Sequence, residues 1–448
     1  MRLGRKRARA LLEGIAGPFA LGVLFLLTSA SRSEATSPRE DVLRALVAEA
    51  RSENPDYRSY ETAIQAAEGQ FVQVTMLPKP QVVAFVGPYL SGGGAGQTVL
   101  GYQQEFELLQ PFYFPGKVSL RKAVARRDVI LAQLLLQEFG LSLEVAVRSL
   151  AQQVAVTVAG AAAAREIEER TSSVVDFLEK RPKAGILGYL DARILAGSLI
   201  GLQQELRWLE ESRWTLIAQL NAYLGRPSDT PVPEQLLPWE SFPPVSLDRL
   251  LAQAQRHNIL LQIHRVLIDR ARQQRKATQI ANYPDLALGP FWMAYQGVNY
   301  DAGPGIEILV GLPVGKAEVP GIEGVAWANQ RGNLATAKAQ EEQAMALFPV
   351  VQRNVESLIF ARLSAYEATR NQLALQPPSL IASLKEAAAL AERQYRIGAI
   401  DVHRFLAAQQ QYLSAFRTTL AARMDAATAW LDLFFLTGGE FTAKGFPE

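Results

Sequence analysis

Apolar and polar positions follow the same order twice along this chain. Residues 43–54 carry an apolar stripe at helical spacing, and residues 247–258 repeat it. In both copies a proline then ends the helical pattern: 204 residues separate Pro80 from Pro284, as they separate Asn54 from Asn258. A constant spacing between separate features indicates an internal duplication.

Each copy places two alternating segments between long helical segments. The first copy predicts a helix over 38–75, strands over 82–89 and 100–108, a helix from 117 to about 180, and a return helix over 189–224. The second predicts a helix over 246–281, strands over 286–295 and 305–312, a stretch over 322–397 interrupted at Pro349 and at 377–378, and a return helix over 401–436. In each copy, two shorter helices stacked end to end match one long helix in length.

The predicted strands have one apolar face and one polar or small face. In 100–108, Leu100, Tyr102, Phe106 and Leu108 share one face, and Gly101, Gln103, Glu105 and Glu107 share the other. Strands of about ten residues fit a transmembrane barrel, but four cannot close one, and open edges are costly in lipid. We therefore expect several copies to complete one barrel. The alternative is a periplasmic β-sandwich insert whose aromatic residues form its core.

The N-terminus is typical of an export signal. Basic residues precede a mostly apolar stretch over 15–28, and residues 33–35 or 28–30 offer a cleavage site. An uncleaved inner-membrane anchor is the alternative, although the stretch is shorter than the roughly 20 residues that span a bilayer. No later segment is predicted to be a transmembrane helix.

The whole pattern divides the chain into five parts. These are a signal peptide over 1–35, a first repeat over 36–226 with strands in 81–109 and a tip turn near 182–189, a proline-rich linker over 227–245, a second repeat over 246–439 with strands in 285–312 and a tip turn near 396–402, and a tail over 440–448.

Composition excludes several classes of function. The net charge of +2 is spread along the chain, so no nucleic-acid surface is indicated. The chain has no cysteine, which excludes disulfides, thiol catalysis and a lipidated N-terminal cysteine. The glycine-rich loop over 91–98 has Gln97 where a phosphate-binding loop needs lysine. The three histidines do not form a metal-ligand pattern, and no catalytic constellation stands out, so we expect no enzyme activity, cofactor or metal.

The two predicted tip turns hold the candidate functional residues. Glycines there suit tight turns through positive φ, and apolar neighbours offer a contact surface. The candidates for docking a partner are Gly185, Ile186, Leu187, Gly188, Tyr189, Ile397, Gly398, Ala399 and Ile400. Plain packing of the hairpins is the alternative.

Several segments together resemble the TolC-like outer-membrane efflux protein family, over roughly residues 38–439. They are Asn54-Pro55 followed by residues 77–80, residues 220–227, Gly185 with Leu190-Asp191, and residues 395–398 followed by 406–409. The resemblance implies a mainly α fold: a duplicated long-helix α-barrel plus four strands per chain, shared in a twelve-stranded transmembrane barrel by a homotrimer. It also implies location in the Gram-negative outer membrane with a periplasmic extension, a periplasmic adaptor at the tips and an inner-membrane pump.

The sequence departs from the family pattern at the tunnel mouth. Family members often carry carboxylates there, whereas Arg404 and Ala407 occupy the matching positions of this chain. Asp191, Asp401 and Arg404 are therefore the candidates for the periplasmic aperture. We expect a passive export conduit. The alternatives are a periplasmic coiled-coil adaptor with a β insert, which would stay soluble after export, and an enzyme on a helical scaffold. No motif in the sequence identifies the cargo or the pump.

Overall fold

The computed structural model describes residues 38–92, 98–180, 185–233, 236, 238–281, 283–297, 300–310 and 327–439. The predicted signal peptide, most of the 91–98 loop, residues 181–184 of the first tip turn, and the tail over 440–448 lie outside these ranges. Within them, long helices and one four-stranded antiparallel sheet make up the fold, and the predicted mainly α fold class is confirmed.

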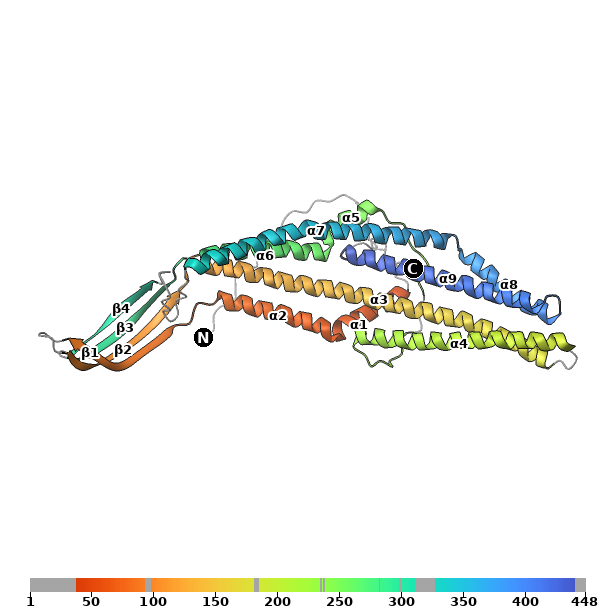
Figure 1. Cartoon of the computed structure of the whole chain (residues 1–448), viewed down its shortest axis with the longest axis horizontal. Helices are drawn as coiled ribbons and strands as arrows, with labels where there is room; N and C mark the ends of the chain where they lie inside the picture. Colours follow the sequence, from red (N-terminus) through yellow and green to blue (C-terminus); the bar gives the residue numbers. More distant parts are fainter. Residues whose placement is uncertain are drawn as a thin grey trace, which may run out of the picture. The chain divides into compact units, whose positions relative to one another are not determined.

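Long helices form in each half because Ala, Leu, Glu, Gln and Arg run on with few breakers. The first half contains α1 (Pro38–Glu53), α2 (Pro55–Thr75), α3 (Lys117–Glu179) and α4 (Gly185–Leu224). The second half contains α5 (Leu247–His257), α6 (Ile259–Ile280), α7 (Trp327–Ala374), α8 (Pro378–Arg396) and α9 (Val402–Leu436). Figure 1 shows α2 and α4 lying one after the other alongside the long helix α3, and both pack against it. The predicted stacking of two shorter helices beside a longer one is confirmed.

Two helices that the sequence predicts as continuous are each broken at an asparagine. Asn54 separates α1 from α2 and caps α2, because its side-chain oxygen accepts from the amides of Asp56 and Tyr57. Asn258 separates α5 from α6 and accepts from the amide of Leu261 in the same way. Both asparagines are 4 % exposed.

Each asparagine also reaches the end of the return helix of its own half. The Nδ2 of Asn54 donates to the carbonyl of Tyr223 at 3.0 Å, and that of Asn258 donates to the carbonyl of Leu436 at 2.7 Å. These carbonyls belong to the last turn of a helix and have no intrahelical donor. We call these two contacts the asparagine joints.

A left-handed glycine completes each joint. Gly225 (φ 69°) follows α4 and Gly438 (φ 72°) follows α9, and the amide bonds around them form Schellman motifs. A Cβ on Gly225 would lie 2.8 Å from the carbonyl oxygen of Glu53, and one on Gly438 would lie 2.1 Å from that of His257. Both the backbone angle and the close approach therefore require glycine.

The sheet joins the two halves in the order β1-β2-β3-β4, with every neighbouring pair antiparallel. Its strands are β1 (Gln81–Gly92), β2 (Thr98–Phe112), β3 (Leu286–Gln296) and β4 (Tyr300–Val310). β4 begins five residues before the predicted 305, because Tyr300 already pairs with Gln296 of β3. In the described residues, β1 and β4 each have only one partner strand.

The predicted alternation of the strand faces is confirmed for β2, whereas β1 and β3 carry apolar side chains on both faces, since Phe85 and Phe291 pair with Glu105 and Glu107. Cross-strand partners such as Val82 and Leu108, or Pro290 and Ile306, are both apolar. This face is exposed: Val82 is 75 % accessible and Ile306 is 76 % accessible. The other face carries the polar side chains of Gln103, Glu105, Glu107 and Glu307.

One further sequence expectation is wrong. The interruption predicted at Pro349 is absent: α7 continues through this residue over 48 residues, although a proline removes one backbone hydrogen bond of a helix. By length and composition alone, one described helix could cross a membrane, namely α3, whose most apolar stretch has a mean hydropathy of 1.5 and is 22 % buried. α3 contacts α1, α2, α4, α6 and α9, so its apolar residues serve helix packing.

The linker after α4 is packed into the main core. Trp239 is 1 % exposed, and its amide donates to the side-chain oxygen of Gln152 on α3 at 3.2 Å. Tyr366 on α7 donates its hydroxyl to the carbonyl of Pro243 at 2.7 Å. Because Tyr366 also packs against Trp430 of α9, the linker joins the core of the second half.

An Asn54→Ala substitution tests the asparagine joints. It removes the cap of α2 and leaves the carbonyl of Tyr223 without its donor, so the free energy of unfolding should fall by about 3 kcal/mol. Asn371→Ala on the exposed face of α7 is the control and should change it by less than about 0.5 kcal/mol. Chemical denaturation of the purified protein measures both, and equal effects would contradict the role of the joint.

Candidate functional site at the helical turns

The turn between α8 and α9 is built by two helix caps in succession. Gly398 has a φ of 78°, its amide donates to the carbonyl of Tyr395, and the amide of Ala399 donates to that of Gln394. This is a Schellman ending for α8. Asp401 then begins α9, because its carboxylate accepts from the amide of Arg404 at 2.8 Å. Few backbone angles in this turn remain free.

The structure separates the predicted docking residues into two groups. Around the second turn, Ile397 is 75 % exposed, Gly398 and Ala399 are exposed, and Ile400 is half-buried. At the first turn, Gly185, Ile186, Leu187, Gly188 and Tyr189 all lie in the opening residues of α4. The predicted positive φ is therefore wrong for Gly185 and Gly188 and holds for Gly398. Tyr189 is 62 % exposed, and the side chains of Ile186 and Leu187 lie outside the description.

An apolar cluster under the turns packs two helical hairpins together. The first hairpin is formed by α3 and α4, and the second by α8 and α9. The buried members of the cluster come from α3, α4, α8 and α9, and they are Val174, Val175, Leu195, Ala391, Tyr395, Val402 and Phe405. The rings of Tyr395 and Phe405 are stacked at 5.5 Å. Burial of these side chains fixes the end of α8 against α3 and α4.

A hydrogen bond close to the turns crosses from the second hairpin to the first. The hydroxyl of Tyr395 on α8 donates to Oδ2 of Asp191 on α4 at 2.8 Å. Burial of the phenol, together with the carboxylate of Asp191, raises the pKa of Tyr395 well above its usual range. Tyr395 therefore stays protonated and remains a donor at physiological pH. We call this contact the tyrosine link.

Arg396, the next residue, contacts α3. Its guanidinium donates to the hydroxyl of Ser173 and lies 5.4 Å from the ring centre of Phe177. The same group donates to Glu392 of its own helix at 2.8 Å. Neighbouring side chains at the end of α8 thus contact both helices of the first hairpin.

The predicted aperture residues differ in their surroundings. Asp191 is half-buried, and its carboxylate already accepts a hydrogen bond from Tyr395 within the chain. The side chains of Asp401 and Arg404 are 61 % and 76 % exposed and lie 4.0 Å apart. A pair this exposed contributes little to stability, and its two charges face solvent. Their role at an aperture stays a prediction.

Sequence reasoning selected the turn residues but missed Tyr395 and Arg396 as functional candidates. Both stand in the segment 395–398 that carries the family resemblance, and this segment was the available sequence signal. Within the described ranges, no three His, Asp or Glu side chains are grouped so as to hold a metal ion. The arrangement can hold the two hairpins together and offer a contact surface, and the residues named here offer no nucleophile with an adjacent base.

Solved structures of outer-membrane proteins share this fold. The outer-membrane channel OprN matches with a TM-score of 0.70 and 16 % identity, over 90 % of this chain and 91 % of that chain. VceC of Vibrio cholerae matches with a TM-score of 0.67 and 18 % identity, over 89 % and 96 %. The CmeC channel of Campylobacter jejuni matches with a TM-score of 0.68 and 14 % identity, over 91 % and 88 %. No protein-family model and no curated protein matches the sequence. The likeness confirms the predicted TolC-like fold.

The pH dependence of stability tests the tyrosine link. Because the pKa of Tyr395 is raised in the folded chain, its stabilising effect is complete below about pH 10, where an unfolded tyrosine ionises, and is lost as the pH rises further. The stability advantage of the wild type over Tyr395→Phe should therefore shrink from pH 10 to 11. Thermal unfolding measures it, with Tyr189→Phe on the exposed side of α4 as the control. A constant advantage would contradict the link.

Proposed function

We propose that this chain is the outer-membrane channel of a tripartite efflux or secretion system in a Gram-negative bacterium. It acts as a passive conduit and performs no chemistry. A homotrimer forms the channel, and a periplasmic adaptor joins it to an inner-membrane pump that supplies the energy. The predicted signal peptide at residues 1–35 fits export of the chain from the cytoplasm.

The observation that carries this proposal is the incomplete sheet with an exposed apolar face. A strand edge with unpaired amides and carbonyls is costly in lipid and invites pairing in water. β4 and β1 are antiparallel within a four-stranded sheet, so β4 of one chain can continue the ladder with β1 of the next. Three chains then close twelve strands, with the apolar face toward lipid.

The polar face of the same sheet supports a water-filled interior. Glu105 and Glu107 of β2 and Glu307 of β4 share the face opposite to the exposed apolar side chains. Porin-type barrels put polar side chains inside and apolar side chains outside. A periplasmic β-sandwich would instead bury its apolar face, and this face is exposed in the single chain.

Exposed apolar side chains on the helices support contacts between chains. On α4, Trp208 is 64 % exposed and Trp214 is 57 % exposed, and on α7 Phe360 is 61 % exposed. Large apolar side chains exposed on a long helix can be covered by a neighbouring chain. In the proposed trimer, the helices of three chains enclose one tunnel, and these residues cover each other between chains.

The turn between α8 and α9 is proposed as a docking surface for the adaptor. Ile397 is held outward by the two caps that fix the turn, so an apolar contact there costs little conformational entropy. The opening residues of α4, from Gly185 to Tyr189, are the other part of this proposed surface. Asp191, Asp401 and Arg404 are proposed to lie near the periplasmic aperture.

The assembly and its conductance test the function. The purified protein should require detergent, have the mass of three chains by native mass spectrometry, and give ion-conducting steps in planar bilayers. A water-soluble monomer without conductance would overturn the proposal and favour a periplasmic coiled-coil adaptor.

Arg404→Glu tests whether the conductance passes the proposed aperture. Replacing an exposed cation by an anion in each of three chains attracts cations, so the cation selectivity of the pore should rise. Arg353→Glu is the matched control, because Arg353 is an exposed arginine on α7. Arg44→Glu would not serve, because Arg44 pairs with Glu40. Equal shifts for both variants would remove Arg404 from the aperture.

Site-specific cross-linking tests docking. The chain has no cysteine, so Ile397→Cys carries a single reactive thiol. In cells, a short bifunctional reagent should link this position to a periplasmic protein, and Val158→Cys on the exposed side of α3 should not give the same product. Identical products from both positions, or none from Ile397→Cys in cells with active efflux, would contradict docking at this turn.

A further inference from the structure

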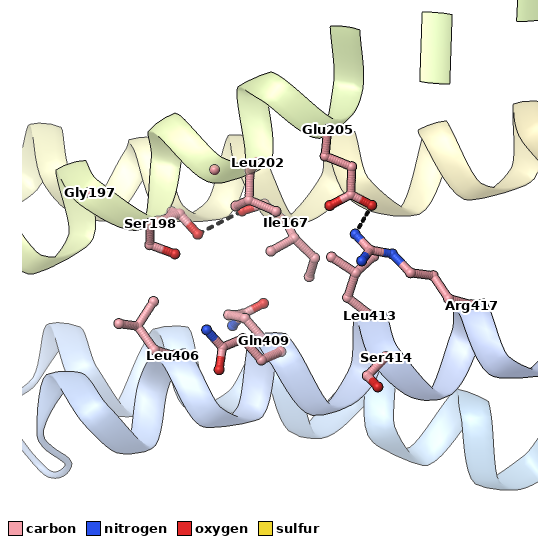
Figure 2. Close-up of a pocket in the computed structure, with 13 residues that line it drawn as sticks. Ile167, Gly197, Ser198, Leu202, Glu205, Leu406, Gln409, Leu413, Ser414 and Arg417 are labelled. Carbon is pink, nitrogen blue, oxygen red and sulfur yellow. Dashed lines mark hydrogen bonds and ion pairs between the residues drawn. The ribbon is translucent and has the colours of Figure 1, made fainter. Parts of the chain in front are cut away.

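A cavity of about 410 Å³ lies between α4 and α9. Figure 2 shows Ser198, Leu202 and Glu205 of α4 on one side, and Leu406, Gln409 and Leu413 of α9 on the other. Ile167 of α3 contributes to the lining from a third helix. The volume falls in the range of ligand-binding pockets. We call this cavity the interhairpin slot.

The slot stays open because α4 presents small residues to it. Gly197 and Gly201 are four residues apart and so share a helix face, and a Cβ on either would meet nothing within 4 Å. Glycine in a helix interior lowers stability relative to alanine. Two glycines at this spacing therefore keep space in front of α4 that larger side chains would occupy.

Gln409 lines this slot and carries a buried acceptor. Its side chain is 1 % exposed, and its Nε2 donates to the carbonyl of Ala388 on α8 at 2.7 Å. This bond fixes which end of the amide carries the oxygen. The buried Oε1 has no donor among the residues that the structure describes. The nearby hydroxyl of Thr171 donates to the carbonyl of Ile167 in its own helix, so it does not serve Gln409.

The charges around the slot neutralise each other. Arg417 of α9 pairs with Glu205 of α4, and this ion pair bridges the two walls, as Figure 2 shows. Leu202, Leu406 and Leu413 supply apolar surface between the polar groups. A ligand with a net charge would find no unpaired partner on these walls, whereas a neutral molecule would leave the ion pair intact.

We propose that the interhairpin slot binds a small neutral amphiphile with a hydrogen-bond donor, such as an aliphatic primary amide or alcohol. The donor binds Oε1 of Gln409, which becomes accessible when the side chains that line the slot move on binding, and the alkyl chain lies against the leucines. The site is formed within one chain, so the proposal holds whether or not the chain is a channel. A ligand there contacts both hairpins at once, since α4 belongs to the first and α9 to the second.

Hexanamide is the probe, and N,N-dimethylhexanamide is its matched analogue without an N–H group. Ligand-observed NMR titration of the purified full-length protein should give a dissociation constant on the order of 1 mM for hexanamide, an ordinary value for eight heavy atoms. The dimethyl analogue should bind about tenfold more weakly, because it cannot donate to Gln409.

Two variants and one control variant tie the binding to the slot. Gly201→Leu should fill the space and abolish saturable binding, whereas Gly332→Leu on the exposed part of α7, where a Cβ also meets nothing within 4 Å, should leave it unchanged. Gln409→Met removes the acceptor with little change in shape, so the two ligands should then bind equally.

Three outcomes would overturn the proposal. They are equal affinities of the two ligands for the wild type, hexanamide binding that Gly201→Leu does not reduce, and no saturable binding of hexanamide at all. The last result would assign Oε1 of Gln409 to an ordered water or to a side chain of another copy. Circular dichroism and the thermal midpoint of Gly201→Leu establish that the variant is folded before it is compared.

Discussion

The two asparagine joints hold the helical part of the fold in its register. Each one stops a helix, restarts it in a new direction, and binds the last turn of the return helix of the same half. The side-chain amide supplies both a donor and an acceptor, so a single buried residue satisfies two helix ends. Without this contact, α1 and α4, or α5 and α9, would lose the polar bond that sets where one ends against the other.

Away from the joints, the two hairpins are fastened by separate polar contacts on either side of a cavity. The tyrosine link binds α8 to α4 close to the turns, and Arg417 binds α9 to Glu205 farther along α4. Between them, the walls of the interhairpin slot carry small residues and leucines. Near the slot, the first and second hairpins are therefore held by these directional bonds together with small apolar clusters that join α3 to α8 and α9. Elsewhere they are held by the apolar packing of the main core.

Local sequence rules predicted the long helices and the strands because both depend on neighbouring residues. The break at Asn54 was missed, although an asparagine followed by proline suits the start of a helix. Asn258 has no proline after it and needs its partner, Leu436, to be recognised. The tyrosine link joins residues 204 positions apart, and the slot depends on which faces of α4 and α9 meet. Such contacts follow from tertiary packing, which periodicity does not specify.

The sheet ends in two different strands, and this has a consequence for self-association. A contact between β4 of one chain and β1 of the next is head to tail, so the same rule that adds a second copy also adds a third. Edge pairing alone sets no limit on the number of copies. Only the rotation between successive copies decides whether the series closes into a ring or grows as an open filament, and side-chain packing far from the strands contributes to that rotation.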